Sequence, residues 1–278
     1  MITEGSTDFF IKPESIALIG ASPDPEKLSY TILESLLKAG FQGKIYPVNP
    51  SYKEIRGLKC YSAPSEIVDK IDIAVFAVSA STVLEILNGP VENIKGSIII
   101  SSGFREIGPE GKKMEILLKE ILEMKGIRAM GPNCLGIYNT ASKVDTFFIS
   151  SDKIERPARG RVSVLTQSGS FAVMIMDEMT NEGSGVARVV SYGNRVDVDE
   201  SDCLEFLAGD EATKAVALYI ESVGNGRRFI AAASRCVKKK PEPSKSEKES
   251  QVQEQQVLIQ ELLAAGMKLM KLLSGKQV

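Results

Sequence analysis

The sequence alternates between short runs of β-branched, apolar residues and longer segments with helical periodicity. Apolar runs at 16–20, 44–48, 71–78, 96–100 and 127–130 predict strands, and the segments 28–39, 83–87 and 111–125 predict helices between them. The run at 71–78 is apolar apart from Asp72, which is typical of a strand buried on both faces. This rhythm predicts an α/β fold with a parallel sheet covered by helices on both faces.

A second, shorter α/β unit follows the first. The segment 138–160 has no periodic pattern and carries Pro157 and Gly160, so we expect an irregular connection between domains. After it, the runs at 161–165, 186–191 and 215–220 predict strands, and the segments 170–181, 200–207 and 227–237 predict helices. The second unit therefore has only about three strand–helix steps.

The composition changes sharply after Lys240. Residues 241–250 are mostly Pro, Ser, Glu and Lys, which predicts a solvated linker. The segment 251–273 predicts an amphipathic helix whose apolar face consists of Val257, Leu258, Leu262, Leu263, Met267, Leu269, Met270 and Leu273. Such a helix usually docks on its own domain or on a partner, and its polar face is not basic enough to favour a membrane surface.

The chain contains no histidine. This excludes histidine-based acid–base catalysis, a Ser-His or Cys-His nucleophile pair, a histidine metal ligand and a phosphohistidine on these residues. The net charge of −2 does not suggest a nucleic-acid partner or an anionic membrane. The cysteines form no CxxC pair, and no run is long enough to span a bilayer, so we expect reduced thiols, no metal site and a cytoplasmic protein.

The ends of the first two predicted strands point to a phosphate-bearing ligand. The turn at Gly20, Ala21 and Ser22 could bring backbone amides close to a phosphate, although a tight turn without a ligand is the alternative. The second strand ends at Asn49 without the Asp or Glu that usually holds the ribose of NAD, and Lys53 follows nearby. This pattern favours a nucleotide with an extra phosphate over NAD.

Other turns fall at the same edge of the predicted sheet. Three follow strands at 78–80, 101–104 and 131–136, and each mixes small residues with hydroxyl or amide groups. The residues of interest in them are Ser79, Ser101, Ser102, Gly103, Asn133 and Cys134. Each turn alone could be ordinary turn chemistry, and Cys134 could equally be a small buried apolar residue.

The second unit offers a further anion site. Ser168, Gly169 and Ser170 stand between a strand and a helix, where amides and hydroxyls could cradle an oxyanion or phosphate. A simple helix cap at Ser168 or Ser170 is the alternative, and a hydrolase is excluded because no histidine could activate the serine. Glu221 ends the third strand, where a carboxylate can be functional or merely exposed to solvent.

Residues 8 to about 238 resemble the CoA-binding, alpha-type part of the NDP-forming (ADP-forming) acyl-CoA synthetases, relatives of the succinyl-CoA synthetase alpha subunit. The matching segments are 9–16, 19–22, 46–50, 102–104, 131–136, 166–170 and 219–221, the last continuing into 226–229. They occur in the family's order over most of the chain.

The resemblance implies a CoA-binding Rossmann-like domain at 1–140 and an incomplete flavodoxin-type domain at 158–240, followed by the linker at 241–250 and the helix at 251–278. It implies that coenzyme A contacts Gly20, Ala21, Ser22, Asn49, Lys53, Ser79, Ser101, Ser102 and Gly103, with its thiol directed towards Asn133 and Cys134. It also implies that Ser168, Gly169 and Ser170 steady a phosphorylated histidine with which Glu221 pairs. In such enzymes Mg-ADP or Mg-ATP lies on an ATP-grasp domain.

The sequence departs from the family pattern at several points. The strand and loop that should carry the histidine are replaced by the polar linker, and the chain has no room for an ATP-grasp domain. Ser51 stands where the family usually has lysine, and Ser79 where it has proline. We therefore expect a CoA-binding subunit or fragment that does not by itself complete the reaction acyl-CoA + ADP + Pi = acid + ATP + CoA.

The expected partners are an ATP-grasp beta-type subunit, through which Mg-ADP or Mg-ATP would be supplied, or a second copy of the chain. One alternative is an inactive CoA or nucleotide sensor, or an assembly protein, suggested by the linker and the C-terminal helix. Another is an NAD(P)-binding oxidoreductase, suggested only by the Rossmann-like start.

Overall fold

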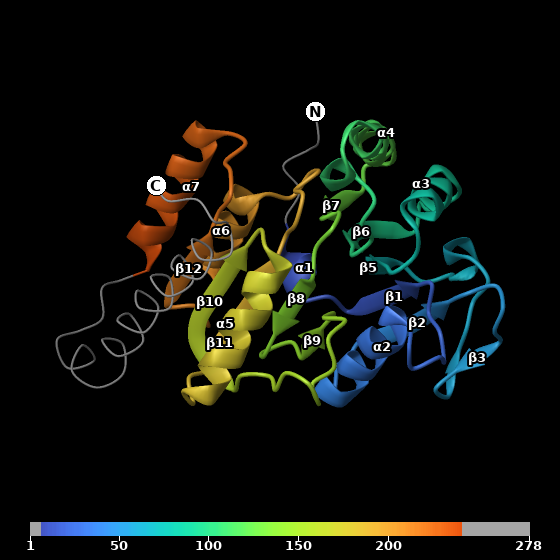
Figure 1. Ribbon diagram of the computed structural model, residues 1–278, viewed down its shortest axis with the longest axis horizontal. Helices are drawn as coiled ribbons and strands as arrows, with labels where there is room; N and C mark the ends of the chain where they lie inside the picture. The colour runs from blue at the N-terminus through green and yellow to red at the C-terminus, as the bar shows by residue number, and fades with distance from the viewer. Residues whose placement is uncertain (1–6, 241–278) are drawn as a thin grey trace.

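The computed structural model describes residues 7–240, which form two α/β units side by side (Figure 1). The first unit is built on a five-stranded sheet with the order β2-β1-β5-β6-β7, in which every neighbouring pair is parallel. Its strands are β1 (Ser15–Ile19), β2 (Lys44–Val48), β5 (Ile71–Phe76), β6 (Ile94–Ile99) and β7 (Arg128–Met130). The predicted parallel sheet is confirmed.

Helices cover both faces of this sheet. The helices are α1 (Asp8–Ile11), α2 (Leu28–Ala39), α3 (Ala80–Asn88) and α4 (Pro109–Lys125), with short 3₁₀ turns at Pro64–Glu66 and Arg105–Ile107 and a hairpin of β3 (Glu54–Ile55) and β4 (Leu58–Lys59). Along β1, Ile16 and Leu18 pack with α1 and α2, whereas Ala17 and Ile19 pack with α3 and α4. Both sets are buried, which is why the strand reads as a continuous apolar run.

The second unit contains a mixed sheet with the order β12-β10-β11-β8-β9. Its strands are β8 (Gly136–Asn139), β9 (Val144–Asp145), β10 (Arg159–Thr166), β11 (Val186–Ser191) and β12 (Ala215–Tyr219). Strands β10, β11 and β12 are parallel, as the repeated rhythm predicts. The helix α5 (Gly169–Asn181) covers one face, and α6 (Glu200–Gly209) and α7 (Gly226–Lys239) lie on the other side (Figure 1).

The segment 138–160 is less irregular than its sequence suggests. Strand β8 pairs antiparallel with β11, and β9 pairs antiparallel with β8. The two strands have four and two residues, which is too short for an alternating pattern to be visible. The segment 136–139 therefore belongs to the second sheet, although it lies within the range 1–140 expected for the first domain.

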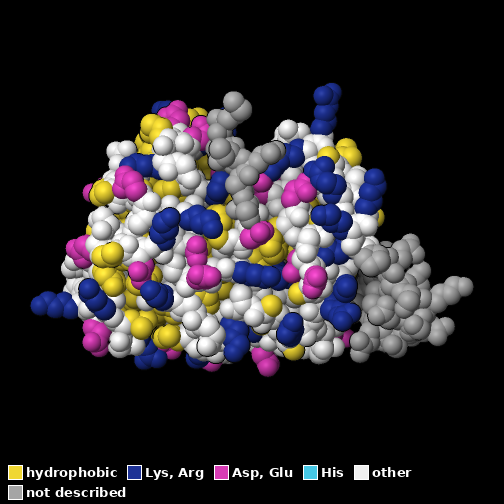
Figure 2. All heavy atoms as spheres, turned by 180° about the vertical axis from the view of Figure 1, so that it is seen from behind, with side chains coloured by type: hydrophobic (Ala, Val, Ile, Leu, Met, Phe, Trp, Pro, Cys, Tyr) yellow, Lys and Arg dark blue, Asp and Glu magenta, His cyan; other side chains and the backbone are white. Residues whose placement is uncertain are grey.

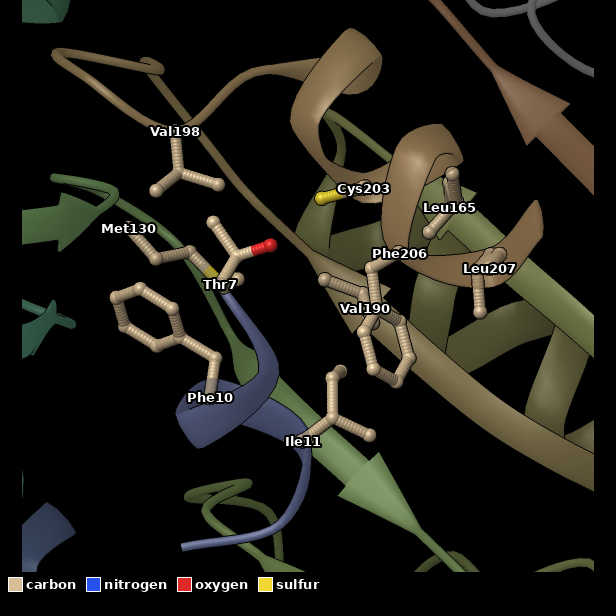
Figure 3. Close-up of a pocket in the computed structure, with 10 residues that line it drawn as sticks. All are labelled: Thr7, Phe10, Ile11, Met130, Leu165, Val190, Val198, Cys203, Phe206 and Leu207. Carbon is tan, nitrogen blue, oxygen red and sulfur yellow. The ribbon is translucent and has the colours of Figure 1, made fainter. Parts of the chain in front are cut away.

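The short helix α1 joins the two units. Phe10 and Ile11 pack with Leu165 and Val190 of the second unit in one apolar cluster. Figure 3 shows their side chains turned towards a small apolar cavity, about 10 Å³ in volume, whose wall includes Cys203. The carbonyl of Ile11 also accepts a hydrogen bond of 2.7 Å from the Asn139 amide. The units thus share a core.

Among the helices of residues 7–240, none combines the length and apolar character that crossing a membrane requires. The predicted linker at 241–250 and the predicted helix at 251–278 lie outside the described residues. Figure 2 shows that positive and negative side chains are interspersed over the face seen from behind, in keeping with the small net charge.

Candidate functional site

A cleft of about 1310 Å³ opens between the two units at the carboxyl ends of their parallel strands. Its wall includes most of the residues singled out from the sequence: Gly20, Ser22, Asn49, Ser79, Ser101, Ser102, Asn133, Cys134, Ser168, Gly169, Ser170 and Glu221. Open α/β sheets bind ligands at this edge, so the topology accounts for the convergence. Ala21, Lys53 and Gly103 are not part of the wall: Ala21 is fully buried, whereas Lys53 is exposed and follows Tyr52, which is on the wall.

The Gly20 turn is tightly packed. Gly20 has a φ of +85°, and a Cβ added there would lie 2.4 Å from a side-chain carbon of Val78. The amides of Gly20 and Ala21 both donate to the carbonyl of Val48, at 2.9 and 3.2 Å. These two amides are therefore occupied, and the turn does not present them to a ligand. Asn49 secures the turn by donating to the carbonyl of Ala21 at 2.8 Å.

Three helices begin at the cleft, and the residues that precede them differ in whether their side chains cap the helix. Ser79 precedes α3 and accepts a hydrogen bond from the Thr82 amide at 3.3 Å, while Ser168 precedes α5 and accepts one from Phe171 at 3.2 Å. Ser168 thus caps α5, one of the two roles its sequence position allows. Lys27 precedes α2 and makes no side-chain cap, since an ammonium group has no acceptor. The positive end of α2 and the Lys27 charge therefore face the same cleft.

Cys134 is a buried, uncharged thiol. Only 4% of the residue is exposed, and its Sγ donates to the carbonyl of Ile99 at 3.3 Å. Burial raises the pKa of Cys134 to about 12, so the thiolate does not form at neutral pH. The neighbouring Asn133 has a φ of +54°, and its amide donates to the carbonyl of Ser101 at 2.9 Å. Cys134 therefore has the character of a small buried apolar residue.

A cluster of polar side chains that the sequence analysis missed bridges the two units. The buried amide of Asn194 donates to Glu106 Oε2 at 2.7 Å and to Glu115 Oε2 at 2.8 Å. Glu106 Oε1 in turn accepts hydrogen bonds from the amides of Gly103 and Phe104, at 2.5 and 3.0 Å. Burial raises the pKa of Glu106, but the bonds from Asn194 and the two amides outweigh it, so the pKa lies below its ordinary value.

Main-chain hydrogen bonds run beside this cluster. The amides of Asn194, Val196 and Val198 donate to the carbonyls of Pro132, Gly131 and Ala129, at 2.9, 2.8 and 2.9 Å. A Cβ added to Gly193, whose φ is +56°, would lie 2.4 Å from the carbonyl oxygen of Pro132. The turn at 192–194 is thus in direct backbone contact with the turn at 131–133.

Two further residues that the sequence analysis did not single out hold the loop after β12. Gln167 Oε1 accepts the amides of Glu221 and Ser222, at 2.5 and 2.9 Å. Arg195 donates to the carbonyl of Ser222, and to its hydroxyl at 3.0 Å. The carboxylate of Glu221 is exposed on the cleft wall while its backbone is fixed. The position of Gln167 in the Thr-Gln-Ser sequence at the end of β10 is the feature of the sequence that could have indicated this role.

Over residues 7–240, no group of three or more Cys, Asp and Glu side chains lies close enough to hold a metal ion. The cations on the cleft wall are Lys27 and Arg105, and Arg105 approaches Glu115 at 3.5 Å. The cleft wall therefore offers a ligand helix ends, hydroxyl and amide groups, the positive charges of Lys27 and Arg105, and the carboxylates of Glu106 and Glu221.

Comparison with known proteins identifies both units. A CoA binding domain matches residues 14–140, and a succinyl-CoA ligase like flavodoxin domain matches residues 159–242. The chain is 40% identical over 235 residues to the acetate–CoA ligase [ADP-forming] II subunit alpha of Pyrococcus furiosus, covering 84% of this chain and 50% of that protein. It is 38% identical to the acetate–CoA ligase [ADP-forming] I of Archaeoglobus fulgidus, covering 82% of this chain and 33% of that protein.

Solved structures agree with these matches. A protein from Pyrococcus horikoshii OT3 superposes with a TM-score of 0.78 at 41% identity, over 84% of this chain and 53% of that one. The dinucleotide forming acetyl-coenzyme A synthetase 1 of Ca. Korarchaeum cryptofilum gives the same TM-score at 35% identity, over 84% and 50% of the two chains. The chain thus spans between a third and about half of the curated relatives named above. Residues 14–140 thus belong to the CoA-binding domain family and residues 159–242 to the succinyl-CoA ligase-like flavodoxin family, and the chain is a homologue of the alpha subunits of ADP-forming acetate–CoA ligases.

Proposed function

We propose that this chain binds coenzyme A in the cleft between its two domains. The observation that carries the proposal is the make-up of the cleft wall: turns of the CoA-binding domain face the start of α5 and the Glu221 loop of the second domain. A long ligand with phosphates at one end and a reactive thiol at the other would span both. Its thiol end would reach the turn at Asn133, beside Ser168 and Ser170.

The start of α2 supports a phosphate position in this cleft. The Lys27 side chain cannot cap α2, and the Tyr30 amide already donates to the Lys27 carbonyl at 3.0 Å, so the first-turn amides that would meet a phosphate are those of Leu28 and Ser29. A phosphate oxygen would accept from these amides and pair with the ammonium group of Lys27. The hydroxyl of Ser22, on the same wall, is a third donor.

We propose that this chain needs a partner chain to carry out the acid–CoA ligase reaction of the family. The phosphoryl group would be passed between acyl phosphate and ADP by a histidine, and these 278 residues contain none. A beta-type subunit with an ATP-grasp domain would supply Mg-ADP or Mg-ATP. In this scheme the start of α5 at Gly169 and Ser170 would form an anion site beside the Ser168 cap, and Glu221 would orient an imidazole brought by the partner.

Titration calorimetry with coenzyme A tests the binding proposal. Replacing Lys27→Glu removes one phosphate contact and reverses its charge, which should weaken binding by at least about tenfold, since one charge-assisted hydrogen bond contributes about 1.5 to 3 kcal/mol. Lys119→Glu makes the same charge change on the exposed side of α4 and should leave the affinity unchanged. The proposal is wrong if coenzyme A does not bind, or if both variants weaken it equally.

A second comparison separates the alternative functions. NADP and coenzyme A are titrated into the same preparation, and tighter binding of NADP would favour an oxidoreductase. Ligase activity is then measured with acetate, ATP and coenzyme A, for the chain alone and with an added ATP-grasp beta-type subunit. We expect product only with the subunit. Coenzyme A binding without activity in either case would favour the sensor or assembly protein.

A further inference from the structure

One side of the cleft, in the second domain, is apolar. Phe148 and Ile149 follow β9, Val173 lies in α5, and the side chains of all three line the cleft. Each of them is half-buried, and each packs against the same apolar core between α5 and the second sheet. We call these three residues the apolar subsite.

The apolar subsite adjoins the start of α5. Val173 comes three residues after Ser170, so the two side chains lie on the same side of the helix. Both residues line the cleft. A group bound at the start of α5 would therefore have Val173 beside it, one turn further along the helix.

Hydrogen bonds fix the part of the apolar subsite that follows β9. The Arg156 guanidinium donates to the carbonyl of Ile149 at 2.6 Å and to Asp145 Oδ2 at 2.8 Å. Asp145 Oδ1 in turn accepts a hydrogen bond of 3.0 Å from the amide of Phe147. The segment 147–149 is thus held in place by the protein's own groups, as is usual for a ligand site that is formed before its ligand binds.

Positive charge is absent from this half of the cleft wall. Between residues 131 and 240, the residues of the wall include no lysine or arginine, and their one carboxylate belongs to Glu221. The two cations of the wall, Lys27 and Arg105, belong to the first domain. A hydrocarbon group would cover apolar surface here that otherwise meets water, whereas a carboxylate would lose its hydration without gaining a cation.

We propose that the acid favoured by this site is a monocarboxylic acid with a hydrocarbon tail larger than the methyl group of acetate, and that this tail packs on the apolar subsite. The proposal rests on the proposed function, because it requires coenzyme A with its thiol end near the start of α5. The methyl group of acetate would leave most of the apolar subsite uncovered. A dicarboxylic acid would place its second carboxylate against Phe148, Ile149 and Val173.

Titration calorimetry with coenzyme A, acetyl-CoA, isovaleryl-CoA and succinyl-CoA tests this proposal without requiring ligase activity. Isovaleryl-CoA has three more carbon atoms than acetyl-CoA, and we expect it to bind at least about tenfold more tightly, since burying two of those carbons is sufficient for this ratio. Succinyl-CoA has an acyl group of similar length that ends in a carboxylate. It should bind no more tightly than acetyl-CoA.

A pair of substitutions on α5 locates the preference. Val173→Ser should lower the ratio of the isovaleryl-CoA affinity to the acetyl-CoA affinity by at least about threefold, because it removes apolar surface from the subsite. Met174→Ser is the matched control: Met174 is the next residue, is also half-buried against the same core, and is not on the cleft wall. It should leave the ratio unchanged. Both affinities are measured on one preparation, so a partly unfolded variant does not alter their ratio.

The outcomes separate this proposal from the one on which it rests. If coenzyme A binds but isovaleryl-CoA has no advantage over acetyl-CoA, or if succinyl-CoA binds more tightly than isovaleryl-CoA, the proposed substrate class is wrong and the proposed function stands. An advantage that both substitutions reduce equally also overturns the assignment to the apolar subsite. If neither coenzyme A nor any acyl-CoA binds, the proposed function fails and the substrate class fails with it.

Discussion

The Asn194 amide is one of the side-chain bridges between the two domains. It donates at 2.7 Å to Glu106 and at 2.8 Å to Glu115, and Glu115 has a side chain that is only 12% exposed. Replacing Asn194→Asp keeps the size of the side chain but turns the donor into a third carboxylate. Asn194→Ala removes the donor without adding a charge, and is the matched control.

The expected magnitudes follow from these contacts. A hydrogen bond to a charged group contributes about 1.5 to 3 kcal/mol to stability. We take the lower value because Glu106 is exposed. Losing both bonds in Asn194→Ala should therefore lower the free energy of unfolding by about 3 kcal/mol. Two like charges 4 Å apart repel by about 1 kcal/mol in water and by about 4 kcal/mol at an effective dielectric constant of 20. We therefore expect Asn194→Asp to lose about 2 kcal/mol more than Asn194→Ala.

Urea unfolding gives the free energy of unfolding of both variants. Circular dichroism is the signal to follow, because the chain has no tryptophan whose fluorescence could report on folding. The pH dependence gives a further check. The pKa of Glu106 is lowered in the folded protein, so its contribution to stability is present above the ordinary pKa of glutamate and is lost as the pH falls through the lowered value. In Asn194→Asp, protonation relieves the repulsion, so its deficit relative to Asn194→Ala should shrink on acidification.

Two results would refute this reasoning. If Asn194→Asp is as stable as the unchanged protein at neutral pH, the amide does not hold the two carboxylates together in solution. If the two variants lose the same stability at every pH, the loss comes from packing and not from charge.

Three further predictions concern the turns and the cleft. Gly193→Ala should lower the free energy of unfolding by about 1 to 3 kcal/mol, because its Cβ would lie 2.4 Å from a carbonyl oxygen. Gly57→Ala, where the space is open, should lower it by about 1 kcal/mol because of the positive φ alone. Chemical denaturation measures the free energy of unfolding of both variants. Cys134 should resist iodoacetamide in the folded protein at mildly alkaline pH and react after unfolding, because its pKa in the folded protein is about 12. Mass spectrometry of the peptide that contains Cys134 measures the labelling, and labelling of the folded protein would contradict the prediction. Gln167→Leu leaves two amides of the Glu221 loop unpaired, so their hydrogen exchange should accelerate by about tenfold or more, and unchanged protection would argue against the role of Gln167.

Most of the fold follows from local sequence patterns. The strands of both parallel arrays are apolar runs because both faces of each array are covered, and this leaves a clear signal in the sequence. The position of the cleft follows as well, since the carboxyl ends of parallel strands meet at one edge. Strands β8 and β9 were missed because so few residues take part, and because β8 pairs with β11 about 50 residues later while β9 pairs only with β8.

The polar contacts of the cleft were less predictable. Glu106 and Asn194 are 88 positions apart, so no local pattern marks them as partners. The Gly20 turn shows the opposite case: the sequence indicates the turn, but only the structure reveals that Val48 occupies the amides expected to meet a phosphate. For Ser168 the sequence allowed a cap or an anion site, and the hydrogen bond to Phe171 shows the cap.

The three main-chain bonds that join residues 194–198 to residues 129–132 have a consequence for evolution within this architecture. Peptide groups make these bonds, so exchanging the side chains on either segment does not remove them, except at Gly193, where the approach is too close for any Cβ. These bonds therefore hold the two segments at a fixed spacing beside the cleft, whose wall includes Gly193 and Asn194. Functional side chains can therefore be gained or lost in this architecture while the spacing between the two domains stays the same.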